Sequence, residues 1–416
     1  MRFALYILLT NIILLVINIP LAIMYLKAPT GTFFPLIHQT HIDYYLYLSA
    51  IRESLQGAWM IPALFTSEPT QTSLLYVFFI FLGKVAYIFH LTPISVYHLA
   101  RVISIEFILI GIYLINSKYL EKKWVFWGSL AGLLSTVPPN WLLQKLNIVS
   151  PLWWNGLNVA GRLYLLPHHA FGIACLLFSV NYLLIYLESK SQKYVLFAGF
   201  LSFLSAISFP PAGLVLVLGI PISIGLYLLR NIRALPKKPA NNIISLVLIT
   251  LLAVLGLLIL RQETLKGFPW SQWKDWDLQE WNKNPPIFNR DYFIGSGLLF
   301  IISIMSSVKL WIKERSLKWI FLSVWAFLPY FLLPFTDLIG IGRIRVTFMA
   351  NYVPMGIIGV LLVKHLVEKN KNRISKIIIS FGIIIMLALL WGPVTYRNIK
   401  EKYDSITFGY INIHIP

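Results

Sequence analysis

The sequence contains little charge and almost no cysteine. Asp, Glu, Lys and Arg make up 12% of the 416 residues, whereas hydrophobic residues make up 58%, and the mean hydropathy is +0.73. So few charged residues are typical of a chain whose surface faces hydrocarbon, and we expect most of it to lie in a bilayer. Because Cys175 is the single cysteine, neither an intrachain disulfide framework nor a thiolate metal site can form.

Nucleotide-binding motifs are also missing. The chain has no Walker-type or dinucleotide-binding glycine motif and no internal repeat, which argues against ATP-driven transport. Its net charge of +19 does not require a nucleic-acid partner, because no basic stripe with interleaved aromatic residues occurs in a soluble segment. Basic loops next to anionic membrane lipids account for that charge.

Long apolar runs, in contrast, are abundant. Eleven runs of spanning length, the first of them expected to be a retained signal anchor, predict an all-α polytopic membrane protein. A further run, 73–90, carries Gly83 and Lys84 and has polar side chains near one helical face, so we predict a juxtamembrane helix there. The predicted spans are 5–25, 97–116, 124–140, 168–187, 194–209, 211–229, 242–260, 293–310, 317–335, 346–363 and 376–393.

Positive charge gathers in the short loops on one side of this arrangement. If the N-terminus is cytoplasmic and 73–90 does not cross, Arg2 and five short loops carry 19 of the 35 Lys and Arg residues. The positive-inside rule therefore predicts a cell (cytoplasmic) membrane protein with a cytoplasmic N-terminus and with 28–72 and 261–292 outside. The five basic loops are 117–123, 187–194, 230–239, 309–318 and 364–376.

The first external loop contains the stretch HQTHIDYYLYLSAIRESLQGAW, residues 38–59. From Asp43 onward its apolar residues recur at helical spacing, which predicts a short amphipathic helix on the outer surface. Asp43 occupies the expected N-cap position, so it either only caps this helix or also acts as a catalytic base. His38 and His41 are expected to hydrogen-bond either the substrate or the residues that hold it. A divalent cation held with Asp43 is possible but not favoured, because further ligands are not evident nearby.

Cations near the outer surface are candidates for binding a phosphate. The stretch GIGRIR at 340–345 supplies Arg343 and Arg345, whose guanidinium forks suit phosphate, with interfacial snorkelling as the alternative. Lys84 and Arg101 are weaker candidates for the same role. His168 begins a span at the outer face and is expected to line the cavity.

Three further features have two interpretations each. Glu68 either assists Asp43 or caps the 73–90 helix. Glu106 lies within a span and is expected to pair with Arg101 rather than to catalyse. Four tryptophans between 267 and 286 form either an interfacial belt or a surface that stacks on sugars.

The order of these pieces resembles a known superfamily. Asp43, the GAW at 57–59 and the 73–90 segment follow one another as in the first external loop of GT-C membrane glycosyltransferases, which include protein O-mannosyltransferases and aminoarabinose transferases. The resemblance covers roughly residues 1–300 of a single transmembrane domain, and 301–416 add further transmembrane helices and a short external tail. In one departure, 139–167 contains no Asp or Glu where many relatives carry a second acidic motif, which argues against metal dependence.

The resemblance implies a glycosyltransferase that takes a sugar from a polyprenyl-phosphate donor and acts, with inversion, on the extracytoplasmic side. Asp43 would be the general base, and Arg343 and Arg345 would bind the donor phosphate. The acceptor, whether glycan, lipid or protein, is not specified, and no cofactor is firmly implied. The alternatives are a lipid-linked saccharide transporter or flippase, which is expected to carry charge near the bilayer midplane, and a non-catalytic homologue.

Overall fold

The computed structural model describes most of the chain, and the statements below concern that part. The fold is almost entirely helical, which confirms the prediction of an all-α membrane protein. Within the described residues, the strands β1 (Thr32–Phe33) and β2 (Ile411–Asn412) form one short antiparallel pair. The described residues are 1–38, 41–135, 142, 145, 156, 159–231, 240–273, 275, 278, 296–369 and 411–412.

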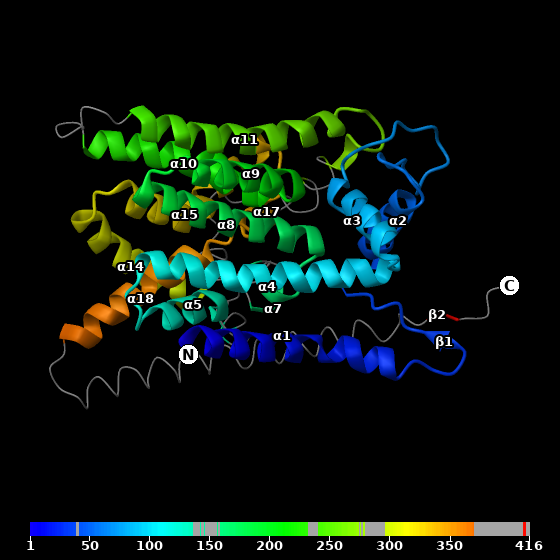
Figure 1. Ribbon diagram of the computed structural model, residues 1–416, viewed down its shortest axis with the longest axis horizontal. Helices are drawn as coiled ribbons and strands as arrows, with labels where there is room; N and C mark the ends of the chain where they lie inside the picture. Colours follow the sequence, from blue (N-terminus) through cyan, green and yellow to red (C-terminus); the bar gives the residue numbers. More distant parts are fainter. Residues whose placement is uncertain are drawn as a thin grey trace.

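Most helices lie side by side in one elongated bundle, and α2 and α3 lie at the end of it where α1 and α11 finish and α4 begins (Figure 1). A large apolar core runs through the bundle, and a smaller one fills the space around α2 and α3. The helices are α1 (Arg2–Leu26), α2 (His41–Leu55), α3 (Val77–Phe89), α4 (Pro93–Tyr119), α5 (Val125–Leu134), α7 (Val159–Leu163), α8 (Pro167–Ser189), α9 (Lys193–Ser208), α10 (Pro210–Arg230), α11 (Ala240–Thr264), α14 (Gly297–Lys313), α15 (Leu317–Leu332), the 3-10 helix η2 (Leu333–Phe335), α16 (Thr336–Ile339), α17 (Arg343–Val346) and α18 (Tyr352–Lys369).

Six helices of the described part are long and apolar enough to cross a membrane. They are α1, α4, α8, α10, α11 and the continuous stretch from α15 to α16. Shorter helices, among them α5 and α9, stand at other predicted spans, and the predicted span 376–393 lies outside the described residues. The total of eleven spans therefore stays a prediction.

The short helix α5 ends before the predicted 124–140 span does, and a buried arginine binds its carboxyl end. Arg162 of α7 donates hydrogen bonds to the carbonyl oxygens of Gly132 at 2.9 Å, Leu133 at 2.7 Å and Ser135 at 2.6 Å. The last carbonyls of a helix have no partner within it, so these bonds satisfy the end of α5 inside the bundle. The sequence pattern did not reveal this role, since Arg162 lies far from α5 along the chain.

Ion pairs join several of the predicted basic loops at the end of the bundle away from α2 and α3. Lys118 and Lys318 both contact Glu188, at 3.1 Å and 3.3 Å, and Lys123 contacts Glu368 at 2.8 Å. The described parts of four basic loops therefore lie together. Exposed ion pairs of this kind contribute little stability. Their positions nevertheless show which loops lie at the same end of the bundle. That this end faces the cytoplasm stays a prediction.

The end of α11 and the segment that follows it contact the loop before α3. The Glu263 carboxylate accepts hydrogen bonds from Ser73 Oγ at 2.9 Å and from the backbone N–H of Leu74 at 2.7 Å. The indole N–H of Trp270, a fully buried side chain, donates to the carbonyl of Gln71 at 2.8 Å. The two long segments that were predicted to lie outside, 28–72 and 261–292, thus meet where the structure describes them.

The helix α3 packs closely across α2 at Gly83. A Cβ atom at this position would lie 2.5 Å from Ser54 Cβ and 2.6 Å from the carbonyl oxygen of Ile51, closer than real Cβ atoms come. Lys84 Nζ donates to the Ser54 carbonyl at 2.9 Å and lies 4.6 Å from the centroid of the Trp59 ring, so it fastens α3 to the end of α2. The 13 residues of α3 span only about 20 Å, which fits a juxtamembrane helix.

Cysteine labelling tests which end of the bundle lies outside the cell. In a Cys175→Ser background, a cysteine at Ser67 or Ser271 should react with an impermeant maleimide in intact cells, whereas one at Ser316 should react only after permeabilisation. All three serines are exposed, and the native Cys175 is buried. Labelling at Ser316 without labelling at Ser271 would reverse the predicted orientation.

Candidate active site

Asp43 lies half-buried in the first turn of α2. The helix begins at His41, so the expectation that Asp43 is its N-cap is wrong, because the helix starts two residues earlier than the apolar spacing indicates. Burial raises the pKa of the Asp43 carboxyl above its ordinary value, although the positive charges of Arg345 and then of His41 act in the opposite direction. A carboxylate that is partly withdrawn from water in this way is a stronger proton acceptor.

Arg345 reaches the same place from the short helix α17, in the other half of the chain. Its charge acts on Asp43 and on the Tyr47 hydroxyl of α2, and also on His168 and His169, which open α8. Arg345 is therefore near enough to two other predicted site residues, Asp43 and His168, for its charge to act on both. Nothing in their sequence spacing places these residues next to one another.

Aromatic side chains surround this group. The Tyr47 ring stacks on Phe79 of α3 with centroids 4.2 Å apart and meets the His168 ring at 5.2 Å. Burial, followed by the negative charge of Asp43, raises the pKa of the Tyr76 hydroxyl. We define Asp43, Tyr47, Tyr76, His168 and Arg345 as the acidic site. Tyr47 and Tyr76 were not predicted to be site residues, because buried tyrosines at helical spacing usually belong to the apolar core.

His168 retains a free hydrogen-bonding atom at this site. Its Nδ1 is buried and makes no hydrogen bond within the part of the chain that the structure describes. The neighbouring ring of His169 turns toward Phe209, at 4.1 Å between centroids, so the two histidines differ in surroundings as expected for adjacent helical residues. A bound substrate can use the free nitrogen of His168 as a partner.

Arg343 takes a different position from Arg345. It is buried, and its Nη2 lies 3.7 Å from the Asp337 carboxylate, which joins α17 to the preceding helix α16. The two arginines of GIGRIR were predicted to share one role as phosphate ligands. In the structure the charge of Arg345 acts on Asp43, whereas Arg343 is paired with Asp337, and a phosphate-binding role for either arginine stays a prediction.

His38 and His41 also differ from each other. His38 is buried, its Nε2 lies 3.1 Å from the Leu165 carbonyl oxygen, and its Nδ1 lies 3.2 Å from the Tyr97 hydroxyl. Both ring nitrogens are therefore engaged, and a hydrogen bond to substrate would have to replace one of these contacts. His41 is exposed at the start of α2 and is close enough for its charge to act on Asp43.

Two remaining acidic residues do not have the structural roles that the sequence predicts. Glu68 is exposed in a loop, and α3 begins only at Val77, so Glu68 does not cap that helix. Glu106 accepts a hydrogen bond from Asn11 at 3.3 Å and does not pair with Arg101, which contacts a different residue of α1. The predicted pairing of Glu106 with Arg101 failed because it assumed a contact along one helix, whereas both side chains contact α1.

Metal ligands and exposed indoles are scarce near the acidic site. Among the residues that the structure describes, no group of three or more His, Cys, Asp or Glu side chains lies close enough together to hold a metal ion. Trp270 is buried and belongs to neither an interfacial belt nor a sugar-stacking surface, and Trp273 lies near Tyr76 at 6.4 Å between centroids. Trp276 and Trp281 lie outside the described residues.

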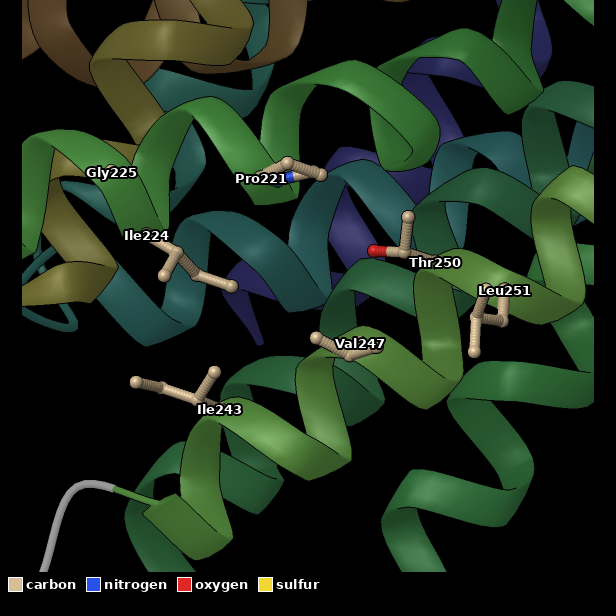
Figure 2. Close-up of a pocket in the computed structure, with 7 residues that line it drawn as sticks. All are labelled: Pro221, Ile224, Gly225, Ile243, Val247, Thr250 and Leu251. Atoms are coloured by element: carbon tan, nitrogen blue, oxygen red, sulfur yellow. The ribbon is translucent and has the colours of Figure 1, made fainter.

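A groove between α10 and α11 is distant from this chemistry. Figure 2 shows it lined by side chains from the half of each helix nearer to the 231–240 connection. Its volume is about 380 Å³ and its lining is almost wholly apolar, which suits a hydrocarbon chain and not a reaction. The lining residues are Pro221, Ile224, Gly225, Ile243, Val247, Thr250 and Leu251.

Solved structures of one enzyme have a similar fold. The oligosaccharyltransferase of Archaeoglobus fulgidus in its apo form aligns with a TM-score of 0.53 and 14% identity over 94% of this chain and 55% of that one. Its complex with zinc and sulfate aligns with a TM-score of 0.55 and 13% identity over 97% of this chain and 53% of that one. No protein-family model and no curated protein sequence matches the chain.

These alignments establish the fold and not the activity. At such low identity they show a shared all-α membrane architecture, which confirms the predicted fold class. The subgroup named from the sequence, the O-mannosyltransferases and aminoarabinose transferases, stays a prediction. The chain spans about half the length of the solved enzyme. The chain therefore shares its overall fold with this solved oligosaccharyltransferase.

Proposed function

We propose that this protein is a membrane glycosyltransferase that moves a sugar from an isoprenoid-phosphate donor to an acceptor hydroxyl on the extracytoplasmic side. The observation that carries the proposal is that Arg345 lies near enough to Asp43 for its charge to act on the carboxyl, in a fold similar to that of an oligosaccharyltransferase. A proton acceptor and a guanidinium beside one another are the two groups that transfer from a lipid phosphate requires.

The reaction assigns one role to each group. The acceptor oxygen attacks the anomeric carbon and gives its proton to Asp43, while the bond from that carbon to the phosphate oxygen breaks. The electron pair leaves on the phosphate, where the Arg345 guanidinium stabilises the growing negative charge. Because attack and departure occur on opposite faces of the sugar in a single displacement, the anomeric configuration inverts.

The remaining members of the acidic site orient the substrates. The free Nδ1 of His168 is a hydrogen-bonding partner for a sugar hydroxyl, and the Tyr47 ring beside it is an apolar surface for the ring of the sugar. His41, exposed at the start of α2, stands at the approach from solvent. These roles would set which sugar binds, whereas Asp43 and Arg345 would carry the chemistry.

Release of the lipid product tests the proposal directly. The purified full chain would be incubated with a panel of polyprenyl-phosphate sugars and acceptor glycans, lipids and peptides, and free polyprenyl phosphate would be measured. Sugar-dependent release in the presence of one acceptor class supports the glycosyltransferase. Movement of a labelled donor across a sealed vesicle, without release from any acceptor class, would instead support the transporter alternative.

Chelation tests whether a divalent cation takes part. We expect the rate of transfer to be unchanged in EDTA, because the described residues contain no cluster of three metal-ligating side chains and 139–167 supplies no carboxylate. Activity would be measured before chelation, after it, and after adding back Mg²⁺ or Mn²⁺. A loss that either ion restores would show that the acidic site works with a metal.

A further inference from the structure

Three lysines and a histidine lie in the last turns of α14 and α18. Lys309 and Lys313 are four residues apart in α14, and His365 and Lys369 are four residues apart in α18. Residues four apart are neighbours on one face of a helix. Lys313, His365 and Lys369 are exposed and Lys309 is partly exposed, so all four side chains are open to the surroundings. We define these four residues as the basic patch.

The packing of the two helices places both pairs at the same level of the bundle. The helix α18 packs closely on α14 at Gly359, where a Cβ atom would lie 4.0 Å from Ser303 Oγ. Both helices finish at the end of the bundle away from α2 and α3, where the basic loops lie together (Figure 1). Lys309 follows Ser303 by six residues and His365 follows Gly359 by six, which is about 9 Å along each helix.

The charges of the three lysines act on the imidazole of His365. Lys309 acts most strongly, ahead of partial loss of water, and Lys369 and Lys313 follow. Together they hold the pKa of this imidazole below its ordinary value, although Glu368 acts in the opposite direction. Positive charges from two helices therefore lie close to one exposed side chain.

Other lysines at this end of the bundle are paired with glutamates. Lys118 and Lys318 share Glu188. Lys123 contacts Glu368 at 2.8 Å. In the part of the chain that the structure describes, none of the three lysines of the basic patch makes an ion pair. Their charges are therefore available to an anion from outside the chain.

An exposed apolar row leads along α14 to the basic patch. It consists of Ile301, Met305, Val308 and Ile312, each more than half exposed. Their spacing of three or four residues places them on one side of the helix. Lys309 follows Met305 by four residues and precedes Ile312 by three, so it borders this row. Lipid chains cover such an apolar side in a membrane, and lysines near its end extend to the headgroups.

We infer that the basic patch is a binding site for the headgroup of an anionic phospholipid, whose acyl chains lie along the apolar row of α14. Phosphate oxygens accept hydrogen bonds from ammonium groups, and basic side chains between two helices suit such a headgroup. Because three ammonium groups lie together, a headgroup with two phosphates should bind more tightly than one with a single phosphate. The inference depends neither on the proposed reaction nor on which end of the bundle faces the cytoplasm.

Native mass spectrometry of the full chain in dodecyl maltoside, a detergent without phosphate, tests the site. The probes are cardiolipin, which has two phosphates, phosphatidylglycerol, which has one, and inorganic phosphate. We expect one cardiolipin to bind the wild type more tightly than phosphatidylglycerol does. Its affinity should fall about 10-fold or more in the double variant Lys309→Gln, Lys313→Gln. The double variant Lys309→Arg, Lys313→Arg keeps both charges and should retain binding.

A matched control separates the site from the general positive charge of this end. The double variant Lys118→Gln, Lys318→Gln also removes two lysines, but these already contact Glu188, so cardiolipin binding should be unchanged. An equal loss of affinity in both Gln double variants would overturn the site. Displacement of cardiolipin by an equal concentration of inorganic phosphate would overturn the lipid assignment. A dimer without lipid that disappears in Lys309→Gln, Lys313→Gln would assign the basic patch to a second copy of the chain instead.

Acetylation of the unmodified protein avoids any effect of the substitutions on folding. The chain would be treated with an amine-reactive acetyl ester with and without cardiolipin, and the modified peptides would be quantified. Bound cardiolipin should protect Lys309, Lys313 and Lys369, whereas Lys27, which is exposed at the other end of the bundle, should react equally in both samples. Equal protection of Lys27, or no protection of the basic patch, would contradict the inference.

Discussion

Replacing Asp43 by Asn should lower the rate of sugar transfer by about 10²–10⁴-fold with little change in donor affinity. Asparagine keeps the shape of the side chain and its place in the first turn of α2, but it cannot take the proton of the acceptor hydroxyl. The loss should therefore appear in the chemical step, measured as single-turnover release of polyprenyl phosphate from saturated enzyme.

A control variant separates this effect from a general loss of charge. Glu188 is an exposed carboxylate at the other end of the bundle, and Glu188→Gln should retain the wild-type rate. If a folded Asp43→Asn protein also retained the wild-type rate, Asp43 would have only a structural role in α2. The proposed reaction would then have no base.

The pH dependence of transfer should follow the same carboxyl. Burial places the pKa of Asp43 above 3.8, its ordinary value, and a general base works only when deprotonated. The rate should therefore fall as the pH is lowered through that raised pKa and should be constant above it. In Asp43→Asn this acid limb should disappear, which a merely structural role for Asp43 would not produce.

The membrane architecture was predictable because it depends on composition and charge. Apolar runs of spanning length and the gathering of Lys and Arg in short loops are properties of local sequence, and the fold has the helices and the loop grouping that follow from them. The binding of Arg162 to the end of α5 was not predictable, because these contacts are made only in three dimensions.

The candidate site was predictable in its members more than in their arrangement. Asp43, His168 and Arg345 are chemically suited residues near predicted span ends, which is how they were found. Their convergence depends on how α2, α8 and α17 pack, and periodicity carries no information about that. For the same reason the sequence could not show that two nearby residues of the same type, Arg343 and Arg345, have different surroundings.

Exchanging Arg345 and Arg343 separately for Gln should give two distinct defects. Arg345→Gln should weaken donor-lipid binding by about 10-fold or more and lower the rate by about 10²–10³-fold, because the contact with phosphate exists in the ground state and strengthens as the leaving group forms. Arg343→Gln should chiefly lower the unfolding temperature, since that side chain is buried and paired with Asp337.

Donor titrations and thermal unfolding of both variants measure the two effects side by side. Asp337→Asn is the control for the second defect, because it removes the same ion pair from its other end and should reproduce the destabilisation of Arg343→Gln without a loss of donor affinity. If Arg343→Gln lost donor affinity as strongly as Arg345→Gln, both arginines would contact the phosphate, as GIGRIR alone indicates. If neither lost affinity, the positive charge beside Asp43 would have another purpose, and the phosphate would have to bind elsewhere in the fold.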